Sequence, residues 1–120
     1  MNQVNNWLNS FKHAFNGMAV ATSERHIRVH MVATVLVICT AFILHISTIE
    51  WLFVYSAIAL VFVSELINTC IESLCDLISI DYSILIKKIK DVAAASVVIS
   101  AIYAIVVATL IILPKIYIHF

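Results

Sequence analysis

The feature that most limits the fold of this chain is a long stretch without charge near its C-terminal end. From Val92 to Leu113 no residue carries a formal charge. A helix of about 20 apolar residues crosses the roughly 30 Å hydrocarbon core of a bilayer, so this stretch predicts a membrane-spanning helix. Pro114 follows at once, and we expect it to end the helix.

Two earlier segments have the same character. Residues 29–46 carry no formal charge, and residues 51–63 are also uncharged, with a helical pattern that continues to residue 77. A short connection at 46–50 and a turn near 81–83 separate the segments. We therefore expect an all-α membrane protein with three transmembrane helices, contained in 29–46, 51–77 and 92–113.

The composition agrees with a membrane protein and excludes several other classes. The chain is 63% hydrophobic and 12% charged and has one Gly, whereas a soluble domain is about half apolar and a quarter charged. A Gly-rich phosphate-binding loop is therefore excluded. Positive and negative side chains balance and form no basic run, so we expect no nucleic-acid partner. Cys39, Cys70 and Cys75 lie in apolar helical sequence without CxxC spacing, and we expect reduced packing residues.

A helix of a different kind is predicted before the spans. Apolar residues recur at steps of three and four between residues 4 and 22, with polar residues between them. This period predicts an amphipathic helix that is too polar to span, so we expect it to lie in the membrane interface. The first 28 residues mix Asn, Ser and His with apolar residues, and we expect no signal peptide there.

The basic residues predict the orientation of the chain. Six of the seven Lys and Arg residues flank the N-terminal helix and the loop at 78–91, and Lys115 alone lies at the opposite end. Because basic loops stay in the cytoplasm, we expect a multi-pass protein with a cytoplasmic N-terminus and an external C-terminus.

A polar stripe interrupts the 51–77 segment. Glu65, Asn68, Glu72 and Asp76 follow one another at steps of three, four and four, which places them within about 80° of one another on one helical face. Carboxylates in a membrane are costly and should face protein or water. Counted from Trp51, Glu65 lies about 21 Å along the helix, at membrane depth, and Glu72 about 10 Å further, near the cytoplasmic boundary.

More charged residues are expected around the cytoplasmic end of this stripe. Glu24 and Arg28 precede the first span, and Lys90 and Asp91 precede the third. Such a boundary site can bind Mg²⁺ through carboxylates and phosphate oxygens, stabilise phosphoryl charge and take up a hydroxyl proton. Spacing alone leaves three interpretations open, namely an enzyme site, an ion or proton pathway, and polar contacts that hold an oligomer together.

The motif that selects among them is the segment from Glu65 to Asp76, which closely resembles a family signature. The signature is E-x-x-N-[ST]-A-I-E-x-x-x-D, that of the bacterial integral-membrane lipid kinases, which comprise diacylglycerol kinase and undecaprenol kinase. Further blocks match in order at 11–17, 24–30, 50–52 and 90–94. The resemblance therefore covers about residues 11 to 113.

The resemblance implies an architecture and a reaction. It implies a single membrane-embedded lipid kinase domain over residues 1–120, a homotrimer with shared sites at the cytoplasmic face, and a bacterial inner-membrane location. The implied reaction is direct, Mg²⁺-dependent transfer of the ATP γ-phosphoryl group to a membrane lipid alcohol, giving undecaprenyl phosphate or phosphatidic acid. The form of the matching blocks is closer to the undecaprenol kinase branch, and diacylglycerol stays open as the acceptor. A non-enzymatic ion or proton pathway subunit is the alternative function.

The resemblance also implies roles for individual residues. Glu65 resembles the acceptor of the lipid hydroxyl proton, and Asn68 the hydrogen-bonding partner between Glu65 and Glu72. Glu24 and Glu72 resemble the metal-binding carboxylates. Arg28 resembles a residue that helps to form the lipid and phosphate end of the site. The expected nucleotide-binding residues are His13, Glu24, Glu72, Asp81, Tyr82, Ser83, Lys90 and Asp91. Lys12, Gly17 and Asp76 are further candidates, with a structural salt bridge equally open for Asp76.

The sequence departs from the family pattern mainly near its N-terminus. His13 stands where the family usually has Tyr, and Ser10 where many members carry Arg, so Lys12 is a candidate to supply the missing charge. Gly17 and Glu24 are also one residue closer than is common. His26 and His30 are spaced to chelate a metal, but no third ligand is evident, and we expect an interfacial role for both.

Overall fold

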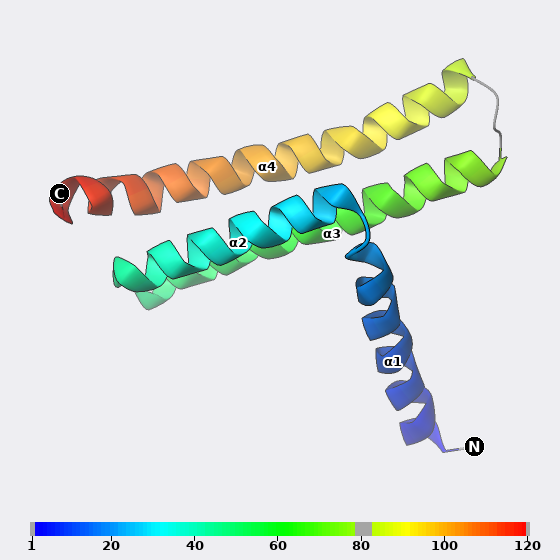
Figure 1. The fold of residues 1–120 in the computed structure, drawn as a ribbon, viewed down its shortest axis with the longest axis horizontal. Helices are drawn as coiled ribbons and strands as arrows, with labels where there is room; N and C mark the ends of the chain where they lie inside the picture. Colours follow the sequence, from blue (N-terminus) through cyan, green and yellow to red (C-terminus); the bar gives the residue numbers. More distant parts are fainter. Residues whose placement is uncertain (1, 79–82, 120) are drawn as a thin grey trace.

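The described residues of the chain form four helices, three of which lie side by side (Figure 1). The computed structural model describes residues 2–78 and 83–119, and the helices are α1 (Gln3–Ala21), α2 (Arg25–Ile43), α3 (Thr48–Ile78) and α4 (Ile84–His119). α3 is the central element, because α2 and α4 both pack against it (Figure 1). α2, α3 and α4 are each long and apolar enough to cross a membrane. The prediction of an all-α membrane protein with three spans is therefore confirmed.

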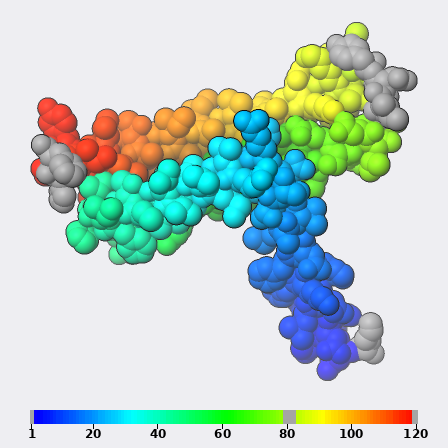
Figure 2. Space-filling view, in the orientation of Figure 1, coloured from blue at the N-terminus to red at the C-terminus, as the bar shows by residue number. Residues whose placement is uncertain are grey.

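α1 points away from the three-helix bundle. Its last turn closes onto residues 22–24 through backbone hydrogen bonds from Ser23 to Val20 (3.1 Å) and from Glu24 to Ala21 (3.0 Å). Glu24 then has an extended backbone (φ −77°, ψ 131°) directly before α2. The change of direction leaves α1 standing out from the bundle, as Figure 2 shows. Its large apolar side chains are exposed, including Val4, Trp7, Leu8, Phe11, Phe15 and Met18.

The connection between α2 and α3 is locally encoded. α2 ends at Ile43, before the expected residue 46, because His45 adopts the left-handed conformation (φ 52°). The Ile46 N–H reaches the Ala41 carbonyl at 3.4 Å and the His45 N–H reaches Phe42 at 3.2 Å, the hydrogen-bond pattern of a Schellman cap.

A capping box then starts α3. The Ser47 N–H donates to Glu50 Oε1 at 3.1 Å, and the Glu50 N–H donates to Ser47 Oγ at 3.2 Å. The two side chains satisfy backbone donors that the first turn of a helix leaves free. Lys115 Nζ reaches the same Glu50 carboxylate at 3.2 Å and ties α4 to the start of α3.

The apolar core lies toward this end of the bundle. Its buried residues are Ala41, Leu44, Ile46, Val54, Ala57 and Val107. The Trp51 ring lies 4.8 Å from Phe42 and stacks on Tyr55 at 5.4 Å, measured between ring centroids. Apolar packing therefore dominates the end that carries the α2–α3 turn, and the polar stripe from Glu65 to Asp76 lies toward the other end of α3.

α4 continues through the proline that was expected to end it. Pro114 lies inside the helix, which extends to His119, so the expected end at residue 113 is wrong. Proline removes one backbone donor and crowds the preceding turn, which weakens a helix without necessarily stopping it. Here the bond from Lys115 to Glu50 holds the turn after the proline against α3. α4 also starts at Ile84, earlier than the predicted span.

Candidate active site

The four residues of the polar stripe on α3, Glu65, Asn68, Glu72 and Asp76, lie on a gradient of burial. Glu65 and Asn68 are 5% and 8% exposed, whereas Glu72 and Asp76 are exposed. The steps of three and four residues explain why one helix carries all four in a row. The row therefore connects a protein-enclosed carboxylate to accessible carboxylates nearer the α3–α4 connection.

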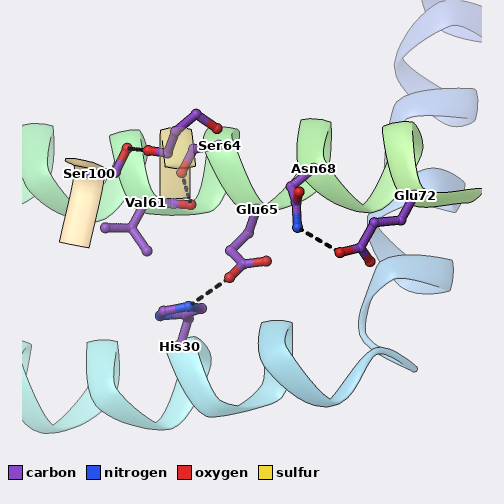
Figure 3. A network of polar contacts seen from close by, with 8 residues as sticks. His30, Val61, Ser64, Glu65, Asn68, Glu72 and Ser100 are labelled. Atoms are coloured by element: carbon purple, nitrogen blue, oxygen red, sulfur yellow. Dashed lines mark hydrogen bonds and ion pairs between the residues drawn. The ribbon is translucent and has the colours of Figure 1, made fainter. Parts of the chain in front are cut away.

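Glu65 has a partner that the sequence did not predict. His30 Nε2 on α2 lies 3.1 Å from Glu65 Oε1, with the two side chains 26% and 7% exposed (Figure 3). The sequence indicated an interfacial role for His30 and no partner, whereas in the structure its ring is half-buried, faces α3 and contacts a buried acid. A signal was present, since His30 is a polar residue within an uncharged stretch, and a buried polar group needs a partner. His26, one turn earlier, is exposed.

Asn68 contacts one of the two acids it was expected to connect. Its Nδ2 donates to Glu72 Oε1 at 3.2 Å, and no hydrogen bond to Glu65 is formed in the described part of the chain (Figure 3). Asn68 Oδ1 is buried and has no hydrogen-bond partner among the described residues. The amide therefore orients Glu72 and leaves one acceptor unsatisfied.

Two lysines near the start of α4 form exposed ion pairs. Lys90 Nζ donates to Asp76 Oδ1 at 2.7 Å and connects α4 to α3. Lys87 Nζ donates to Asp91 Oδ2 at 2.7 Å within α4. Ion pairs between exposed side chains are weak, because water and salt screen their charges. The salt-bridge role that was left open for Asp76 is thus observed, and the pair is weak enough for Lys90 to exchange partners.

The remaining candidates are more widely distributed. Glu24 and Arg28 are exposed at the start of α2, Ser83 directly precedes α4, and Asp81 and Tyr82 lie outside the described residues. Lys12, His13 and Gly17 lie on the exposed α1. Within residues 2–78 and 83–119, no side-chain hydrogen bond or ion pair joins α1 to the acids of α3, and no group of three potential metal ligands is found.

Two cavities border these residues. A groove of about 760 Å³ separates α1 from α3, and Gly17 and Glu24 both line it. A Cβ added at Gly17 would meet nothing within 4 Å, so packing within this chain does not explain the glycine. A second cavity, about 110 Å³ and mostly apolar, lies among α2, α3 and α4 with His30 in its lining.

Comparison with known proteins identifies the family of this chain. Residues 12–112 match the family described as prokaryotic diacylglycerol kinase. The chain belongs to this family. The undecaprenol kinase of Bacillus subtilis (strain 168) is 36% identical over 115 residues, which cover 95% of this chain and 94% of that protein. The diacylglycerol kinase of Synechocystis sp. (strain ATCC 27184 / PCC 6803 / Kazusa) is 37% identical over 111 residues, which cover 91% of this chain and 63% of that protein.

Membership of the prokaryotic diacylglycerol kinase family makes this chain a lipid kinase of the membrane, which confirms the predicted enzyme class. Lipid kinases transfer a phosphoryl group from a nucleotide, and such transfer depends mainly on positioning and charge stabilisation. A buried carboxylate, a row of accessible carboxylates and nearby lysines are side chains suited to that chemistry.

Proposed function

We propose that this kinase phosphorylates a membrane lipid hydroxyl with ATP and Mg²⁺ at the cytoplasmic face of a bacterial inner membrane. The observation that carries the proposal is the gradient along α3, from the buried Glu65 to the exposed Glu72 and Asp76. A lipid alcohol approaches from the membrane and a nucleotide from water, so their reaction needs a site that connects the two environments. The whole chain then acts as one lipid kinase domain.

In the proposed reaction Glu65 is the base. The lipid hydroxyl oxygen attacks the γ-phosphorus of ATP while Glu65 takes the hydroxyl proton. The bond between the γ-phosphorus and the bridging oxygen breaks, and ADP leaves with that electron pair. Burial keeps water away from Glu65, and Asn68 orients Glu72 through its 3.2 Å hydrogen bond.

Glu72 and Glu24 are the proposed ligands of Mg²⁺. Both carboxylates are exposed, and Mg²⁺ commonly binds one or two carboxylates together with substrate phosphates. The described residues contain no cluster of three His, Cys, Asp or Glu side chains. Mg²⁺ does not need one, because two carboxylates and the phosphate oxygens of ATP can bind it. When bound, Mg²⁺ would neutralise part of the negative charge on the phosphates of ATP. Lys90 and Asp91 are proposed to contact the nucleotide, and Arg28 the phosphate and lipid end. The further proposed nucleotide contacts are His13, Asp81, Tyr82 and Ser83, with Lys12 and Gly17 nearby.

The lack of polar contacts between α1 and the acids of α3, within the described part of the chain, supports a shared site. α1 carries His13 and Lys12 but makes no polar contact with the α3 acids in the described part of the chain. We therefore propose a homotrimer in which neighbouring subunits complete each site. α1 is proposed to lie amphipathically on the membrane surface, since its large apolar side chains are exposed. Cytoplasmic placement of the N-terminus follows the distribution of basic residues.

Undecaprenol is the proposed acceptor, with diacylglycerol as the competing one. The match to the undecaprenol kinase of Bacillus subtilis covers both proteins almost completely, whereas the match to the Synechocystis diacylglycerol kinase covers 63% of that protein. The test is a mixed-micelle assay with labelled ATP and Mg²⁺, in which both lipids are offered separately and in competition. Transfer mainly to undecaprenol is expected. Transfer mainly to diacylglycerol would reassign the acceptor.

Two variants test the assignment of the acids. Glu72→Gln should raise the KM for Mg²⁺-ATP and lower kcat, and Glu65→Gln should lower kcat with ATP binding retained. Glu50→Gln is the matched control, since it changes an acid of α3 at the opposite end of the helix. Wild-type activity in both site variants would refute the proposed site. Proton or cation flux in liposomes without ATP consumption would favour the ion-pathway alternative.

A further inference from the structure

We propose that His30 is a positioning residue for the transfer of the lipid hydroxyl proton to Glu65. It holds the Glu65 carboxylate so that one oxygen faces the reacting hydroxyl. The inference rests on the proposed function, in which Glu65 takes the hydroxyl proton. It adds a residue from another helix, since His30 comes from α2 and Glu65 from α3. The contact that carries it is the 3.1 Å approach of His30 Nε2 to Glu65 Oε1.

The chemistry of the two groups determines which one donates. A carboxylate that serves as a base must be ionised, and an ionised carboxylate can only accept hydrogen bonds. His30 Nε2 must therefore carry the hydrogen, either as the neutral tautomer protonated at Nε2 or as the imidazolium ion. In either form the ring holds Oε1 and leaves Oε2 free.

The direction of the free oxygen agrees with this role. In Figure 3 the bonded oxygen of Glu65 points to His30, and the second oxygen points along α3 toward Asn68 and Glu72. That is the side on which the accessible carboxylates lie. A hydroxyl located between Glu65 and the nucleotide would meet the free oxygen, while the bond to His30 keeps the carboxylate from rotating away.

A purely space-filling role explains the histidine less well. His30 borders the apolar cavity of about 110 Å³, whose other lining includes the small residues Ala33, Ala57 and Ala104. The cavity is partly open to the surface of the bundle, and packing alone would not require a polar side chain at its edge. A larger apolar residue would fill the space better, whereas only a side chain with a donor at this reach satisfies the buried Glu65.

The test compares three variants of α2 in the lipid phosphorylation assay. His30→Leu removes the donor, His30→Gln keeps an N–H donor, and His26→Leu is the matched control at an exposed position one turn earlier on α2. The loss of a hydrogen bond to a charged group corresponds to about a 10- to 100-fold change in a rate or equilibrium constant. We expect His30→Leu to lower kcat by that factor with the KM for ATP within about twofold. His30→Gln should recover to within about fivefold of wild type, and His26→Leu should match wild type.

A double-variant cycle shows whether His30 acts through Glu65. Because the two residues act as a unit, adding His30→Leu to Glu65→Gln should lower kcat by less than about twofold further. A full additional loss would mean that His30 works independently of Glu65 and would overturn the proposal. Wild-type kcat in His30→Leu would overturn it as well.

A measurement on the unmodified histidine covers the case in which His30→Leu does not fold. Nitrogen NMR of the 15N-histidine-labelled protein should show His30 protonated at Nε2, and the signal should shift in Glu65→Gln. An unchanged signal in that variant would overturn the proposal. Failure of the proposed function is distinguishable, since it would appear as wild-type activity in Glu65→Gln or no transfer by the wild type.

Discussion

Replacing Asn68 with Leu should separate the activity of this kinase from its stability. Asn68 donates one hydrogen bond, from Nδ2 to Glu72 at 3.2 Å, while its Oδ1 is buried without a partner in the described residues. Leu is similar in size and removes both groups. The variant therefore loses the contact that orients Glu72 and, at the same time, a buried acceptor that makes no hydrogen bond.

The two losses have opposite effects on folding. A hydrogen bond to a charged group contributes about 1.5–3 kcal/mol, and the exposure of Glu72 places this bond at the lower end. An unsatisfied buried polar atom costs about 1–3 kcal/mol. The free energy of unfolding should therefore stay within about 1 kcal/mol of wild type or rise. If the loss of this hydrogen bond raises the free energy of the transition state by about 1.5 kcal/mol, because Glu72 is no longer oriented, kcat should fall about tenfold.

The assay pairs kcat for transfer from labelled ATP with the unfolding midpoint in a denaturing-detergent titration. Asn68→Asp is the matched control, because it keeps the size and adds a second carboxylate one turn from Glu72. That variant should lose both activity and stability, since like charges at this spacing repel and burial penalises the charge. If Asn68→Leu instead unfolds much more easily and keeps wild-type kcat, the reasoning about both groups is refuted.

Three further predictions concern the two ends of the bundle. Asp76→Asn should lower the KM for ATP by up to about fivefold, because the exposed and solvent-screened ion pair holds Lys90 only weakly; a raised KM would contradict the phosphate-binding role of Lys90. Lys115→Met should lower the free energy of unfolding by about 1 kcal/mol through loss of its bond to Glu50, with kcat within about twofold; a tenfold loss of kcat would contradict the placement of the site at the other end. Pro114→Ala should slow amide hydrogen exchange in the last turns of α4, because it restores a backbone donor inside the helix; faster exchange would show that proline stabilises this end.

Contacts within one helix were the predictable part of the candidate site. The repeat of 3.6 residues places Glu65, Asn68 and Glu72 on one face whatever surrounds the helix. The hydrogen bond from Asn68 to Glu72 is of this local kind, since the residues are four apart. The same repeat gave no information on the partner of Glu65, which lies 35 residues away on another helix.

Helix ends were predicted less well than helix positions. α2 ends at Ile43 because His45 takes the left-handed conformation, and hydropathy carries no information on that choice of backbone angle. Pro114 was expected to stop α4, but a helix can lose one backbone hydrogen bond and continue when its later turns are held elsewhere. Here Lys115 holds them through Glu50 on α3.

The sequence by itself determined that this chain spans a membrane three times and carries a row of acids on one helical face. Both properties follow from length, apolar content and the helical repeat, which are local. Only the tertiary structure decided which residues those acids meet: His30 for Glu65 and Lys90 for Asp76. These pairings depend on how α2 and α4 are rotated and shifted along α3. Interlocking side chains set that geometry, and no repeat within a single helix encodes it.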